Sequence, residues 1–103
     1  MRIIAVRTLR EFWMQYPESE QPLKAWCAEA RAAAWTAPSD IKTRYRSASV
    51  LNSERVVFNI GGNKYRLIVS VNYSVGVVFI KFIGTHAAYD QIDARTVEWN
   101  PRS

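Results

Sequence analysis

The sequence predicts an α+β fold, in which N-terminal helices pack on one face of a mostly antiparallel sheet of about four strands. Two observations predict it. Residues 55–84 contain three β-prone runs separated by turns with glycine, and residues 8–35 contain two stretches with apolar side chains at helical spacing. The 103 residues suit a single hydrophobic core. We therefore expect one domain over residues 1–103, with a short flexible tail at 98–103.

The first third of the chain supplies a strand and two helices. Residues 2–6 are a strand candidate, and Thr8 with Glu11 fits a capping box at the start of the first helix. Ser19 is expected to cap a second helix over residues 20–35. Apolar residues fall on one face of each helix: Leu9, Phe12, Trp13 and Tyr16 in the first, and Leu23, Trp26, Cys27, Ala30 and Ala34 in the second.

Three shorter elements complete the prediction. A helical turn is expected from Pro38 toward Tyr45, and a fourth strand over residues 47–51. Residues 91–96 are expected to add another helical turn near the end of the chain.

The register of the three β-prone runs decides which side chains share a face. Gly61-Gly62 favours a two-residue loop that places Val57 opposite Arg66, and Val75-Gly76 favours a second one that places Ser70 opposite Lys81. Because a one-residue slip would mix the two faces, their clean separation supports this register. One face carries the cations Arg55, Lys64, Arg66 and Lys81. The other is the expected core face, formed by Val56, Phe58, Tyr65, Leu67, Val69, Val71, Val78, Ile80 and Phe82.

Composition narrows the class of protein. The formal net charge of +5 fits an anionic partner, although many basic proteins have none. One Cys and one His are too few for a zinc site, and no segment approaches the ~20 apolar residues of a membrane span. We expect a cytoplasmic protein that has no metal or other cofactor. Direct DNA binding is not expected, since the sequence shows no helix-turn-helix pattern.

The turn after the third β-prone run places His86 close to Tyr89 and Asp90, beside the predicted cationic face. RNA cleavage without a metal uses the 2′-hydroxyl as nucleophile, and it needs a base, an acid and positive charge at the phosphorane. Asp90 either orients His86 or caps a terminal helix, and the cap is the favoured role. A solvated basic face and a capped strand end explain the same residues without any chemistry. The residues themselves favour Arg66, His86 and Tyr89 as catalytic candidates, with Arg55, Lys64, Asn63 and Lys81 as candidate RNA contacts; Lys81 becomes a catalytic candidate only through a family resemblance.

One set of motifs indicates a protein family more specifically than the net charge does. It consists of Asp40–Lys42, Val57–Leu67 and Gly84–His86, followed by Tyr89-Asp90. Together these motifs resemble the HigB toxin family of bacterial type II toxin–antitoxin systems. The resemblance implies a RelE-like fold and ribosome-dependent cleavage of translated mRNA. It also implies neutralisation by a cognate HigA-type helix-turn-helix antitoxin, with operator DNA reached only through the antitoxin complex.

The resemblance assigns roles to individual residues. Arg66 corresponds to the arginine that RelE-like toxins place at the scissile phosphate, and Lys81 to a second cation. His86 is the first choice as acid or base, with Tyr89 as a stacking or alternative proton-carrying group. Two other functions use the same face: a non-catalytic RNA- or ribosome-binding inhibitor of translation, and a regulatory subunit that docks an acidic antitoxin segment.

Overall fold

The computed structural model describes residues 1–98 and consists of a sheet with helices on both faces. Five strands follow the order β1-β5-β4-β3-β2, and β1 pairs parallel to β5 while the other pairs are antiparallel. The strands are β1 (Arg2–Ile4), β2 (Ser49–Val50), β3 (Arg55–Ile60), β4 (Tyr65–Asn72) and β5 (Val77–Thr85). The helices are α1 (Val6–Gln15), the 3-10 turn η1 (Pro17–Ser19), α2 (Glu20–Ala32), α3 (Pro38–Arg44) and α4 (His86–Tyr89).

The predicted α+β fold is therefore confirmed, with one strand more than expected. The additional pairing is that of β1, which joins the sheet at its edge beside β5. The single domain over residues 1–103 stays a prediction, and the predicted tail beyond Glu98 lies outside the described residues.

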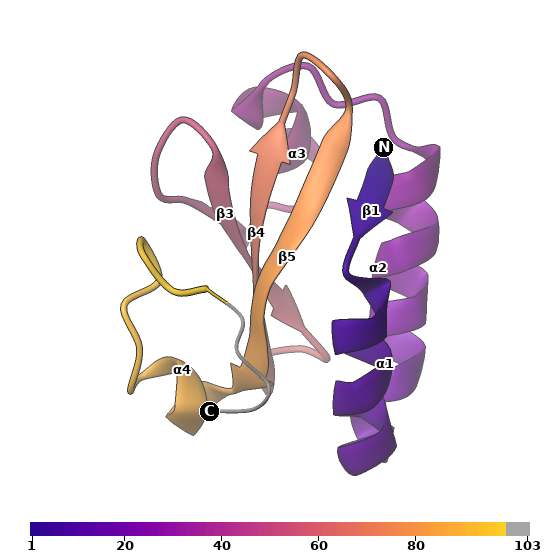
Figure 1. Ribbon diagram of the computed structural model, residues 1–103, viewed down its shortest axis with the longest axis vertical. Helices are drawn as coiled ribbons and strands as arrows, with labels where there is room; N and C mark the ends of the chain where they lie inside the picture. Colours follow the sequence, from indigo (N-terminus) through magenta and orange to yellow (C-terminus); the bar gives the residue numbers. More distant parts are fainter. Residues whose placement is uncertain (99–103) are drawn as a thin grey trace.

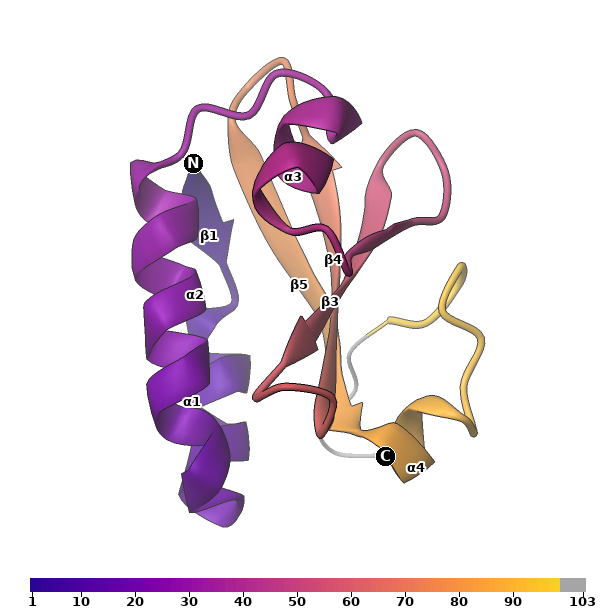
Figure 2. The same cartoon turned by 180° about the vertical axis from the view of Figure 1, so that it is seen from behind.

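Helices α1, α2 and α3 cover one face of the sheet, which we call the core face (Figures 1 and 2). Phe58 lies at the centre of this layer and is 1% exposed. Its ring packs edge-on against Trp26 and Tyr45 and stacks on Trp35. The opposite face, which we call the outer face, carries α4 and the chain that follows it (Figure 1).

Both hairpin turns are longer than predicted. Ile60 pairs with Tyr65 and Asn72 with Val77, so each loop holds four residues rather than two. The first loop begins with Gly61 at φ 63° and Gly62 at φ 73°, a backbone region that favours glycine. The β3–β4 register is shifted by two residues from the prediction, and an even shift leaves each side chain on its predicted face.

A β-bulge in β5 overturns one part of the predicted core. Ile68 pairs with Phe82 but Val69 pairs with Ile80, which leaves Lys81 as the extra residue. An extra residue reverses the alternation of side chains beyond it. Phe82 therefore lies on the outer face with Val57 and Ile68, whereas the prediction placed it on the core face.

The predicted helix ends also need correction. Helix α1 begins at Val6 after Ala5, which has φ 75°, and Thr8 is buried within the helix instead of capping it. The Ser19 hydroxyl donates to the Tyr16 carbonyl (2.7 Å) and does not cap α2. Helix α2 ends at Ala32, three residues before its predicted end, and the strand predicted over residues 47–51 shortens to Ser49–Val50.

Within residues 1–98, none of the helices combines the length and apolarity needed to cross a membrane.

Candidate functional site

Arg66 and Tyr89 form the centre of the candidate site, at the end of the outer face next to α4. Arg66 is opposite Gly84, and α4 follows β5 directly. The Thr85 hydroxyl caps α4 by accepting from the Ala88 N–H (3.2 Å). This turn brings the Tyr89 ring under the Arg66 guanidinium, with Cζ 5.7 Å from the ring centroid. Such a contact holds a cation in place without neutralising its charge.

The first hairpin turn supports the same arginine. Arg66 Nη1 donates to the Asn63 carbonyl at 3.2 Å, so the turn and α4 hold the guanidinium from two sides. A backbone bond from the His86 N–H to the Lys64 carbonyl (3.2 Å) joins the turn to the start of α4. Asn63 is therefore part of the cluster through its backbone, and its side chain is exposed.

His86 lies at the first position of α4, beside Asp90. Its Nδ1 is 3.4 Å from Asp90 Oδ2, and both side chains are about half exposed. The Asp90 backbone N–H donates to the His86 carbonyl (3.1 Å) and closes the helix. The Asp90 carboxylate therefore faces the imidazole, the role that was not favoured. It caps no terminal helix, because the described residues 91–98 form turns and no helix. The His86 and Tyr89 ring centroids are 6.5 Å apart.

The other end of the outer face is not the open cationic surface that was predicted. Residues 91–98, which we call the C-terminal strap, lie across it (Figure 1). Turn hydrogen bonds shape the strap, including one from the Val97 N–H to the Asp93 carbonyl (2.9 Å). Its apolar side chains pack with Tyr89 on a small second core under the strap: Ile92, Ala94 and Val97 against Val57, Ile68 and Phe82.

Arg55 was predicted to lie on an open cationic face, and this placement is wrong. The strap leaves Arg55 only 8% exposed. Its Nη1 donates to the carbonyls of Ala94 (3.2 Å) and Val97 (2.8 Å), and its Nη2 to the Glu98 carboxylate (2.6 Å). A buried guanidinium needs such partners, and the strap supplies them.

Lys81 is bound by the same carboxylate. Its Nζ donates to Glu98 Oε1 at 2.8 Å, so Glu98 bridges the two cations. The Lys81 hydrogen bond and charge, together with those of Arg55, hold the pKa of Glu98 below its usual value.

Lys64 also departs from its predicted place. It belongs to the hairpin turn and not to the strand, and its Nζ lies 3.4 Å from the Glu18 carboxylate in η1. The structure therefore brings Arg66, His86 and Tyr89 together with the backbone of Asn63. The side chains of Arg55, Lys81 and Lys64 lie outside this cluster.

Sequence reasoning missed the strap and Glu98. The signal that was present is the run of apolar residues after α4, together with the apolar side chains of Val57 and Ile68 on a face assigned to cations. A hollow of about 500 Å³ lies beside Tyr89 and is lined largely by the strap.

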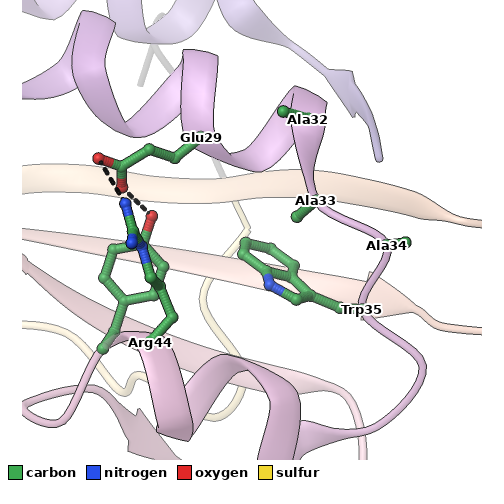
Figure 3. Close-up of a pocket in the computed structure, with 7 residues that line it drawn as sticks. Glu29, Ala32, Ala33, Ala34, Trp35 and Arg44 are labelled. Atoms are coloured by element: carbon green, nitrogen blue, oxygen red, sulfur yellow. Dashed lines mark hydrogen bonds and ion pairs between the residues drawn. The ribbon is translucent and has the colours of Figure 1, made fainter.

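The second hollow, of about 390 Å³, lies between α2 and α3 on the core side (Figure 3). Glu29 joins the two helices there, since it accepts a hydrogen bond from the Tyr45 hydroxyl and forms an ion pair with Arg44 (3.4 Å). Burial, with the neighbouring Glu29 carboxylate, raises the pKa of Tyr45. This cavity belongs to the helix layer and is separate from the cluster at Arg66. Among residues 1–98, no three His, Cys, Asp or Glu side chains gather in a way that could hold a metal ion.

The fold and the cluster define a small RelE-like domain with a cationic site on the outer face of its sheet. A family model described as HigB toxin, the RelE-like toxic component of a toxin–antitoxin system, matches residues 19–92. The chain belongs to this family. A curated relative, the mRNA interferase HigB of Escherichia coli O6:H1, is 24% identical over 94 residues, which cover 89% of this chain and 91% of the relative. The family membership implies an antitoxin partner.

Proposed function

We propose that this protein is an mRNA endonuclease that cleaves translated messages on the ribosome and so inhibits translation. The observation that carries the proposal is the Arg66 guanidinium held over the Tyr89 ring beside the exposed imidazole of His86. The name of the E. coli relative, mRNA interferase, supports the same activity.

In the proposed reaction, the RNA supplies its own nucleophile. The 2′-hydroxyl gives its proton to a base and attacks the adjacent phosphorus, and the bond to the 5′-oxygen breaks as that oxygen takes a proton from an acid. The products are a 2′,3′-cyclic phosphate and a free 5′-hydroxyl. Arg66 would stabilise the negative charge that grows on the phosphorane, because its position is fixed before the substrate binds.

His86 is the proposed proton carrier. Its Nδ1 faces Asp90, which leaves Nε2 as the nitrogen turned to the substrate. Tyr89 would orient Arg66 and contact a nucleobase of the RNA with its ring. Its hydroxyl is the alternative proton carrier. Lys81 would supply further positive charge on the same face. Asn63 and Lys64, at the hairpin tip, are proposed contacts to RNA or to the ribosome.

The proposal includes the cellular setting. The protein would act in the cytoplasm as a single domain, without a metal ion. A HigA-type helix-turn-helix antitoxin would neutralise it, and operator DNA would be bound only by the complex of the two proteins.

The experiment is controlled expression in a bacterium with mapping of mRNA 5′ ends. Wild type should arrest growth and create new 5′ ends inside translated frames. Arg66→Ala and His86→Ala should abolish these ends while the purified variants keep the wild-type melting temperature. Arg7→Ala is a matched control, since Arg7 is an exposed cation of α1 that forms an ion pair with Glu11.

Two outcomes would redirect the proposal. Growth arrest without new 5′ ends, retained by His86→Ala, would mean inhibition by occupying RNA or the ribosome. Cleavage of ribosome-free RNA by the purified protein that disappears with EDTA and returns with a divalent cation would show that the chemistry needs a metal.

A further inference from the structure

We propose that the position between Lys81 and Arg55 is a binding site for a phosphate of the RNA backbone, which the Glu98 carboxylate occupies while the protein is free. The inference rests on the proposed function, because it assumes that RNA crosses the outer face. It adds a second anion site to the cluster at Arg66, and it gives Glu98 the role of an internal competitor.

The contacts of Glu98 are those of an anion held by two cations. One oxygen accepts from Lys81 Nζ at 2.8 Å and the other from Arg55 Nη2 at 2.6 Å. Two oxygens of a phosphodiester present the same charge and a similar fork to such donors. The position is thus shaped for an oxyanion, whichever molecule supplies it.

The two cations are largely covered, whereas Glu98 is largely exposed. Arg55 is 8% exposed, and its Nη1 is tied to two strap carbonyls. Lys81 stands at the β-bulge, which aims its side chain along the outer face. The Glu98 side chain is 63% exposed and can turn into solvent. A buried guanidinium left without an anion is costly, so Glu98 should leave only when another anion replaces it.

The position also lies on the path from Arg66. Arg55 pairs with Ser70, and Asn59 pairs with Arg66, so the two ladder positions are four residues apart on β3. Four residues of a strand span about 14 Å. A short extended run of RNA that passes over the strap can cover this distance, so one RNA strand can place a phosphate near each end of the outer face.

The test measures binding of a single-stranded RNA oligonucleotide with 2′-O-methyl groups, which cannot be cleaved by 2′-hydroxyl attack. Glu98→Gln removes the competing charge but keeps the shape of the side chain. Glu11→Gln makes the same change of net charge on α1, where the carboxylate pairs with Arg7. We expect Glu98→Gln to bind the RNA about two- to fivefold more tightly than Glu11→Gln, the range of an exposed ion pair.

A second pair of variants checks that Glu98 acts through Lys81. Lys81→Met should weaken RNA binding, and in that background Glu98→Gln should gain less than it does alone. The apolar contacts of the strap do not involve Glu98, so both variants should keep a cooperative melting transition, lowered by no more than the loss of an exposed ion pair.

Equal affinities of Glu98→Gln and Glu11→Gln would overturn the inference, because the effect would then be one of net charge. So would an undiminished gain in the Lys81→Met background. If affinity rises as expected but no mRNA is cut in cells, the phosphate site stands and the proposed activity fails. If mRNA is cut but the two glutamine variants bind alike, only the site fails.

Discussion

The guanidinium of Arg66 lies over the ring of Tyr89, with Cζ 5.7 Å from the ring centroid, although 23 positions separate the two residues in the chain. The contact depends on α4, whose first turn is capped by Thr85 and carries Tyr89 back over β4. The proposed phosphate-binding arginine and the proposed proton carriers are thus positioned by one short helix.

A simple experiment distinguishes the role of the Tyr89 ring, which makes this contact, from the role of its hydroxyl. Tyr89→Phe keeps the ring under Arg66, so we expect mRNA cleavage within about threefold of wild type. Tyr89→Ala removes the ring, and we expect about a tenfold loss, the size of a partly buried cation–π contact. The rates come from primer extension on a reporter message. A loss of roughly 10²–10⁴-fold in Tyr89→Phe would instead identify the hydroxyl as the proton carrier.

Phe58 tests the assignment of the core face. It is 1% exposed and contacts Trp26, Trp35 and Tyr45, so Phe58→Ala should lower the free energy of unfolding by about 3–5 kcal/mol. Denaturant unfolding measures the change. Met14→Ala is the control: Met14 is 78% exposed, and its replacement should stay within about 0.5 kcal/mol of wild type. Equal stabilities of the two variants would show that the core lies elsewhere.

Much of the fold could be predicted because an error of two residues in the strand register leaves each side chain on its predicted face. The predicted two-residue loops were each two residues too short, but the alternation of Val56, Phe58, Leu67 and Val69 toward the core survives such a shift. The motifs around Arg66 and His86 also predicted that these two residues lie close together, because glycines mark the ends of the elements that carry them.

The face of Phe82 and the position of the strap could not be predicted, because the residues near each of them in the sequence give little indication of either. The bulge at Lys81 reverses the alternation of β5 without any glycine or proline at that residue, so the sequence placed Phe82 on the wrong face. The helical turn predicted over residues 91–96 does not form a helix. The strap consists of turns, and its place is set by contacts with Val57 and Arg55, more than thirty residues earlier. Such long-range contacts are not visible in a local pattern.

Gly84 gives a prediction that follows from the bulge. A Cβ at this position would lie 2.5 Å from Cζ of Phe82 and 3.3 Å from the Ala88 Cβ, so the Phe82 ring would have to move. We expect Gly84→Ala to destabilise the protein by about 1–3 kcal/mol. In a Phe82→Leu background the added methyl group meets a shorter side chain, and the cost should fall. An equal cost in both backgrounds, measured by denaturant unfolding, would assign the strain to the backbone instead.

The attachment of the strap should depend on pH through Glu98. The pKa of this carboxyl is held below its usual value by the hydrogen bond from Lys81 and by Arg55. A group whose pKa is lowered by folding stabilises the protein above its unfolded pKa, near 4.5, and this contribution is lost as the pH falls through the lower folded value. Because Glu98 is largely exposed, we expect its charge to contribute at most about 1 kcal/mol to the free energy of unfolding.

The measurement compares melting temperatures of wild type and Glu98→Gln from neutral to acid pH. Wild type should be the more stable protein at neutral pH, and the difference should vanish once Glu98 is protonated. Glu11→Gln, in which only an exposed i,i+4 pair is lost, should differ less from wild type at neutral pH. A difference for Glu98→Gln that persists unchanged into acid would mean that its charge does not hold the strap.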